Sequence, residues 1–278
     1  MYRGTASFIL RSPRIIINCP PGSNGFEVDG GGVKVRVKCE GGVAVYELEA
    51  VSESQEAIRE KAELFAYSMS LIHGVGLEMS NFTMAWLSIA LQTMSDGKAT
   101  VSAGVIVPIK YQLVTTEYIN EALIRRTMEL MDKLENALRN PSTSKRAEEL
   151  LRIVKWWVSG GLDEDPLDRF LKFFVAFELL ASLKGYKGKN KEKGKKGKNK
   201  DHEEESGGSW VEAFCKKYGL ACEFEGMRVN EVRNLIMHEP GEDRDRAEEV
   251  ARKHADEFGQ EVLKAVWRVL SEELKISI

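Results

Sequence analysis

The feature that most constrains the fold of this chain is a change in hydrophobic period near residue 115. Up to about Val114 the dominant period is two, as in residues 32–39, where Val33, Val35 and Val37 alternate with basic residues. From Glu117 onward the period is 3.6 almost throughout. We therefore expect an α+β chain with a β-rich mixed domain over residues 1–115 and an all-α antiparallel helical bundle over residues 116–278. Two domains also suit 278 residues, at about 150 residues per domain.

The N-terminal region is predicted to consist of strands around one helix. Residues 33–39 and 43–50 form a hairpin about Gly41 and Gly42, and the three glycines at 30–32 are a turn. Further candidate strands are residues 7–11, 14–18, 82–91 and 99–114. Between them, residues 54–73 carry a helical stripe that Gly74 ends.

The C-terminal region is predicted to be helical from end to end. One stripe runs over residues 119–138, and a second runs over residues 147–158 and stops at Gly160. Pro166 takes a first helical position and opens a helix to Leu183 that is apolar nearly all round, so we expect it at the centre of the bundle. Three further helices are predicted at residues 209–218, 227–238 and 245–274.

A low-complexity insert separates the central helix from the next one, at about residues 184–208. Residues 184–200 contain nine Lys and one Glu, and no core can form from them. One interpretation is a solvated loop. The other is a flexible basic arm that gains affinity for phosphates by releasing their counterions.

Charge, cysteine content and hydropathy bear on the cellular location and the partners of the protein. The net charge of −3 gives no global field that would recruit nucleic acid or an anionic membrane. The four cysteines show no CxxC spacing and are too few for a disulfide scaffold in a chain this long, which favours a reducing cytosol. The N-terminus lacks the apolar stretch of a signal peptide, and no segment is apolar enough to span a bilayer. We expect a cytoplasmic protein without a membrane partner.

Most polar clusters have a simple structural explanation. The acidic residues 163–165 and those at 242, 243 and 245 each precede a helix, where carboxylates favour the helix dipole. His202 lies beside glutamates in a segment too irregular to fix a coordination geometry, and His254 has no evident partner. We therefore expect no metal and no cofactor.

The segment from Gly226 to Gly241 is different. Its apolar residues form one stripe of a helix that Pro240 and Gly241 stop. On the opposite side Asn230, Asn234 and His238 stack at a spacing of four residues, with Arg233 on the flank. Arg233 and His238 are five residues apart, roughly 7.5 Å along the axis, so that their side chains can converge. Such a pair is also common on ordinary solvated faces.

Glu178 adds a second observation. It lies within the apolar helix, where a buried carboxylate needs a cationic or hydrogen-bonding partner. Arg233 is a plausible partner, although a purely structural ion pair would explain both residues equally well.

The segment Arg233-Asn234-Leu-Ile-Met-His238 resembles the Arg-polar-X-His signature, RX4-6H, of the HEPN superfamily (higher eukaryotes and prokaryotes nucleotide-binding). The apolar helix from Pro166 to Leu183 resembles that family's second core helix, with Glu178 as its recurring acidic residue. The resemblance covers about residues 144–274, less the lysine-rich insert, and leaves the first 115 residues unexplained. The insert itself departs from the family pattern.

The resemblance implies a homodimer whose paired helices form one cleft for metal-independent cleavage of RNA, and a toxin or defence role beside an antitoxin. A 2′-hydroxyl can attack the neighbouring phosphate if a base takes its proton and a cation stabilises the developing charge. His238 would act as base or acid, and Arg233 would clamp the phosphate. Asn234 would orient the substrate or the imidazole, and Glu178 would hold Arg233. The products would be a 2′,3′-cyclic phosphate and a 5′-hydroxyl.

Two other hypotheses use the same residues. The first is a non-catalytic HEPN module that binds a nucleotide or a partner such as a nucleotidyltransferase through the same polar face. The second treats that face as ordinary solvated surface on a structural or assembly factor.

Overall fold

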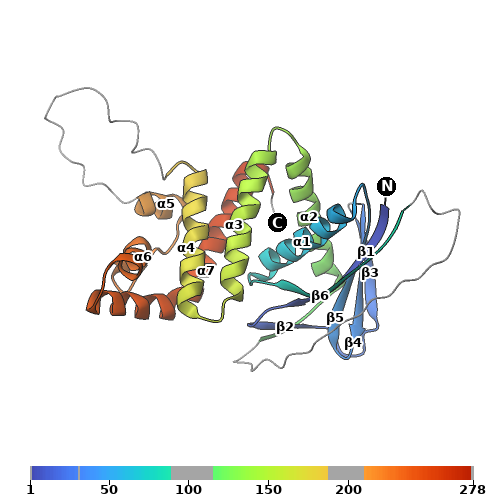
Figure 1. Cartoon of the computed structure of the whole chain (residues 1–278), viewed down its shortest axis with the longest axis horizontal. Helices are drawn as coiled ribbons and strands as arrows, with labels where there is room; N and C mark the ends of the chain where they lie inside the picture. The colour runs from blue at the N-terminus through green and yellow to red at the C-terminus, as the bar shows by residue number, and fades with distance from the viewer. Residues whose placement is uncertain (1, 31, 89–114, 187–209, 277–278) are drawn as a thin grey trace. The chain divides into compact units, whose positions relative to one another are not determined.

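The computed structural model describes residues 2–30, 32–88, 115–186 and 210–276. It is an α+β structure, as the two hydrophobic periods predict, and its contacts divide it into two compact units, Met1–Asn140 and Pro141–Ser277. Figure 1 shows the elements of both units, and each unit is described by itself.

The first unit is built on a seven-stranded sheet. The strands β3, β4, β5, β1 and β6 lie side by side in that order and pair antiparallel, while β2 pairs with β5 and runs parallel to β7. The hairpin predicted about Gly41 and Gly42 is confirmed by the pairing of β4 with β5. The strands are β1 (Tyr2–Arg11), β2 (Ile15–Asn18), β3 (Gly25–Gly30), β4 (Val33–Glu40), β5 (Val43–Ser52), β6 (Glu78–Ser88) and β7 (Thr115–Tyr118).

The helix α1 (Gln55–His73) lies on the sheet and buries one face of it. Its predicted ends are confirmed, because the side chain of Ser54 accepts a hydrogen bond from Ala57 N at 3.1 Å and Gly74 ends the helix in the left-handed conformation. Phe65 of α1 packs against Phe8 and Tyr46 of the sheet at ring-centroid distances of 6.1 and 5.9 Å. Alternate residues of β1, β4 and β5 thus form the core of this unit.

The helix α2 (Glu121–Arg139) packs against α1 and β3. The nearly buried side chains of Lys61 and Glu135 join the two helices, with the Lys61 ammonium 2.5 and 2.6 Å from the two carboxylate oxygens. The contacts therefore group α2 with the sheet, and the division between units falls after Asn140 rather than near residue 115. A helical period reveals a helix but not the partner against which its apolar stripe packs. The predicted strand at residues 99–114 lies outside the described residues.

The second unit is a bundle of helices around α4, as predicted for the segment that Pro166 opens. Asp165 caps α4, and its side chain accepts a hydrogen bond from Leu167 N at 2.8 Å, which confirms the capping role expected for the 163–165 cluster. The helices are α3 (Ser144–Leu162), α4 (Pro166–Leu183), α5 (Trp210–Tyr218), α6 (Val229–His238) and α7 (Glu242–Leu274). A short hairpin of β8 (Glu223–Phe224) and β9 (Met227–Arg228) precedes α6.

Two glycines let α3 and α7 approach α4 closely. Phe173 of α4 lies where a Cβ on Gly160 or Gly259 would have to be, with ring carbons 2.7 and 2.4 Å from those hypothetical positions. Trp157 of α3 donates a hydrogen bond from Nε1 to the carbonyl of Gly259 at 2.9 Å. The prediction that Gly160 ends the preceding helix is therefore wrong, since α3 continues to Leu162 and Gly160 lies inside it against Phe173.

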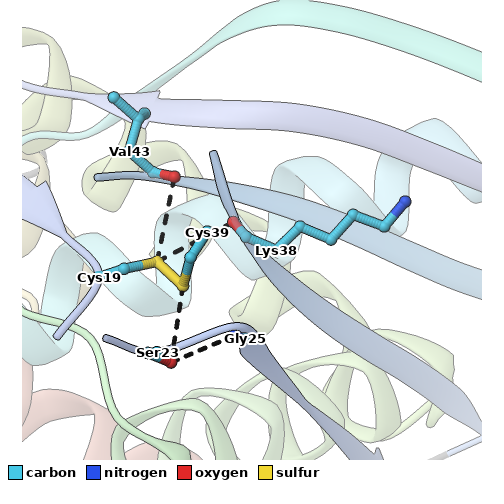
Figure 2. The surroundings of a disulfide bond; sticks show 6 residues. All are labelled: Cys19, Ser23, Gly25, Lys38, Cys39 and Val43. Carbon is cyan, nitrogen blue, oxygen red and sulfur yellow. Dashed lines mark hydrogen bonds between the residues drawn. A yellow bond between two sulfur atoms is a disulfide. The ribbon is translucent and has the colours of Figure 1, made fainter. Parts of the chain in front are cut away.

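All four cysteines are paired in two disulfides, although their spacing predicts none. Cys19 bonds to Cys39 and Cys215 bonds to Cys222. Figure 2 shows the first disulfide between the end of β2 and β4, with the hydroxyl of Ser23 3.7 Å from the sulfur of Cys39. Spacing along the chain does not reveal such pairs, because strand pairing brings distant residues together. The inference from cysteine count to a reducing compartment therefore loses its basis.

Candidate functional site

The helix α6 carries the predicted site and is held at its start and along its apolar face. At its start, the backbone N–H of Val229 donates to the carbonyl of Cys222 at 3.0 Å, which ties the helix to the Cys215–Cys222 disulfide. The apolar face packs on α7 and α4 and is fully buried at Val229 and Val232. This leaves the opposite face turned outward, as the helical stripe predicts.

On the outward face the predicted cation and imidazole meet. Nη1 of Arg233 lies 3.4 Å from Nε2 of His238 and 3.1 Å from Oδ1 of Asn234. Arg233 is half-buried, while Asn234 and His238 are exposed. The three side chains therefore form one polar cluster, which we call the α6 cluster.

A guanidinium has donors only, so Nε2 of His238 is the acceptor in this contact. The α6 cluster thus places a cation beside an imidazole nitrogen, and such a pair of groups can bind a phosphate and transfer a proton.

Glu178 lies half-buried on α4, a helix that packs against α6. The structure thus places Glu178 on the neighbouring helix, while the side chain of Arg233 contacts those of Asn234 and His238. Its role as the residue that holds Arg233 stays a prediction. Asn230 lies one turn before Asn234, and its Oδ1 is buried without a hydrogen-bond partner among the described residues.

His254 has partners that the sequence did not reveal. Its Nδ1 lies 3.0 Å from Glu257 and its Nε2 lies 3.2 Å from Glu225 in the β8–β9 turn. The ring also stacks on Phe224 at a centroid distance of 4.9 Å. These contacts fasten the hairpin that leads into α6 to the long helix α7. Only the i, i+3 pair with Glu257 could have been found from spacing, because Glu225 reaches the ring through the hairpin.

Comparisons with protein-family models, with curated proteins and with solved structures find no match to this chain. Within the described ranges, no helix is both long and apolar enough to cross a membrane. The same residues contain no group of three or more His, Cys, Asp or Glu side chains suited to a metal ion.

Proposed function

We propose that this protein is a metal-independent endoribonuclease of the HEPN type, with Arg233 and His238 at the reacting phosphate. The approach of Nη1 of Arg233 to within 3.4 Å of Nε2 of His238 is the observation that carries the proposal. It brings a phosphate-binding cation and a proton-transfer group to one place on an accessible helix face. Polar residues on an ordinary solvated surface need not bring a guanidinium and an imidazole into contact.

The reaction follows from these groups. RNA would draw the guanidinium of Arg233 onto a phosphate, since two of its N–H groups match two phosphate oxygens. That movement would release Nε2 of His238 to take the proton of the 2′-hydroxyl as its oxygen attacks the phosphorus. The bond to the 5′-oxygen then breaks, that oxygen takes a proton from an imidazolium, and the products are a 2′,3′-cyclic phosphate and a 5′-hydroxyl. Asn234 would orient the ribose or the imidazole.

A homodimer completes the proposed site. In one chain Asn234 and His238 are exposed, whereas oriented phosphate contacts gain strength when water is excluded. Two α6 helices facing each other would enclose the scissile bond and supply one histidine as base and the other as acid. A toxin or defence role, with an antitoxin or a nucleotidyltransferase as partner, belongs to the same proposal.

The test is cleavage of single-stranded RNA in EDTA by the purified protein. We expect cyclic-phosphate ends and no cleavage of DNA of the same sequence, which lacks the 2′-hydroxyl. His238→Ala and Arg233→Ala should each abolish cleavage without changing the oligomeric state. His73→Gln in the first unit and Arg246→Ala on α7 serve as controls and should cut normally. Activity that survives in both site variants would overturn the proposal, and binding of intact RNA without cleavage would favour the non-catalytic HEPN module.

A further inference from the structure

A polar cavity lies between α3 and α4, and none of the residues that line it belongs to the α6 cluster. Its volume is about 380 Å³, within the range that small ligands occupy. Ile153 and Leu179 give it an apolar floor, and Arg146, Arg152 and Ser182 line it with polar groups. An apolar floor with a few convergent polar groups is typical of a ligand site.

The two arginines of the cavity differ in how they are held. Arg146 donates a hydrogen bond from Nη1 to the carbonyl of Leu183 at 3.0 Å, and its guanidinium lies 3.8 and 3.9 Å from the carboxylates of Glu149 and Glu273. Arg152 is exposed, and it makes no hydrogen bond or ion pair with any residue that the structure describes. The cavity therefore contains one positioned guanidinium and one guanidinium that is available to an anion.

An exposed aromatic ring, that of Trp156, lies one helical turn beyond Arg152, outside the residues that line the cavity. Trp156 is 36% exposed, whereas its neighbour Trp157 is 2% exposed and hydrogen-bonded in the core. Residues four apart lie on the same side of a helix. An indole left in solvent beside a free guanidinium is a combination suited to stacking a nucleobase next to its phosphate.

The charge of α3 agrees with this interpretation. The helix has four basic and two acidic residues in a chain whose net charge is −3. An anion is therefore attracted to this helix more than to the chain as a whole.

We propose that the α3–α4 cavity binds a nucleoside phosphate, with the phosphate on Arg152 and Arg146 and the base stacked on Trp156. The carboxylate of Glu149 would accept a hydrogen bond from a ribose hydroxyl. The ligand is a free mononucleotide or one nucleotide of an RNA strand, and both present the same groups. The site is independent of cleavage, because none of its residues belongs to the α6 cluster.

The test uses the full chain carrying His238→Ala, so that RNA stays intact whatever its fate in the wild-type protein. Adenosine 5′-monophosphate, a single-stranded RNA 12-mer and inorganic phosphate are titrated by calorimetry and by tryptophan fluorescence. We expect both nucleotide ligands to bind and to quench the fluorescence. Arg152→Gln and Trp156→Ala should each weaken binding about tenfold, the loss of one charge-assisted hydrogen bond or one stacked ring. Trp156→Phe should remove the quench.

Matched controls are Arg246→Gln and Trp267→Phe on α7, which should leave affinity and quenching unchanged. Tighter binding of the 12-mer that Arg152→Gln and Trp156→Ala also weaken would identify an RNA strand as the ligand of the cavity, because RNA held by Arg233 of the α6 cluster would not respond to them. Equal or tighter binding of the mononucleotide would identify a free nucleotide. Because Arg152 and Trp156 are exposed, their variants should keep the melting temperature of the parent. Affinities unchanged by Arg152→Gln and Trp156→Ala, or binding of inorganic phosphate as tight as that of the nucleotides, would overturn the proposal.

Discussion

The backbone N–H of Val229, the first residue of α6, donates a hydrogen bond to the carbonyl of Cys222, and Cys222 is covalently bonded to Cys215 of α5. The start of the helix that carries Arg233 and His238 is thus attached to a disulfide. The neighbouring N–H of Ala221 donates to the carboxylate of Glu261 on α7 at 3.0 Å, which fixes the same turn to the bundle. The geometry of the α6 cluster therefore depends on a turn that a reductant can alter.

The first prediction concerns this disulfide. Replacing both cysteines in Cys215→Ser/Cys222→Ser should lower the free energy of unfolding of the second unit by roughly 2–3 kcal/mol, the loop-closure entropy of a short ring. It should also shift the NMR signals of the His238 ring, because the start of α6 loosens. Cys19→Ser/Cys39→Ser is the matched control, and it should destabilise the first unit without moving those signals. Equal effects of the two double variants on His238 would contradict the prediction.

The second prediction concerns the guanidinium of Arg233. Arg233→Lys keeps the positive charge but loses the planar fork that can hold two phosphate oxygens and the His238 contact together. On the proposed function we expect kcat for RNA to fall on the order of 100-fold, as for the loss of an oriented transition-state contact, with a smaller change in KM. The measurement is steady-state cleavage of a fluorogenic oligonucleotide. A lysine variant with wild-type kcat would show that charge alone is enough.

The third prediction concerns the glycine at the crossing of α4 and α7. Gly259→Ala gains about 1 kcal/mol of helix propensity, but its Cβ would lie 2.4 Å from Cε2 of Phe173 in a packed core. Overpacking costs about 1–3 kcal/mol and more where no neighbour can move, so we expect a net loss of stability in urea denaturation. Phe173→Leu introduced together with Gly259→Ala should restore part of it. A more stable Gly259→Ala protein would show that the crossing is looser than the structure indicates.

The fourth prediction concerns pH. The hydrogen bond from Lys253 and then that from His254 lower the pKa of Glu225 below its ordinary value. A carboxylate with a lowered pKa in the folded state stabilises the fold above its unfolded pKa and loses that effect as the pH falls through the folded pKa. Glu225→Gln should therefore lower the melting temperature at pH 7 and have little effect at acid pH, where the carboxyl group is protonated in both the folded and the unfolded state; a melting series across pH would measure this. Glu239→Gln, an exposed carboxylate without an ion pair among the described residues, is the control.

The fifth prediction concerns the pair between α1 and α2. The side chains of Lys61 and Glu135 are only 10% and 12% exposed, so removing one leaves a charge in a poorly solvated place. Lys61→Met should cost about 1–3 kcal/mol, because the carboxylate of Glu135 then keeps only its pair with the exposed Arg139. The double variant Lys61→Met/Glu135→Leu should cost less than that single variant, because neither charge remains buried. Additive losses in chemical denaturation would mean that water reaches the pair freely.

Local patterns predicted the elements of this fold well. The ends of α1 at Ser54 and Gly74, and the start of α4 at Pro166, depend on residues within one turn of the helix end and could be read from the sequence. The division between units could not, since α2 is amphipathic whichever partner it has. The two disulfides and the β8–β9 hairpin could not be predicted either. Residues that pair across a turn, or from distant parts of the chain, produce no periodic pattern in the sequence.

In the candidate site, too, the helix face could be predicted from the sequence but the side-chain contacts could not. Helical spacing placed Arg233, Asn234 and His238 on one face, and the structure brings their side chains into contact. Spacing could not reveal that Arg233 takes Nε2 of His238 as acceptor, because this depends on side-chain rotamers. Nor could it reveal the contacts of His254, whose partner Glu225 reaches it across a hairpin.

The ring of Phe173, wedged against both Gly160 and Gly259, has a consequence for how the second unit opens. Three helices share one aromatic ring, so none of them can separate without exposing it to water. Their amide protons should then exchange with deuterium through a single shared event that requires the largest opening of that unit. The amide protons of the segment from α5 to α6, which is not one of these three helices, should exchange faster, through smaller local openings.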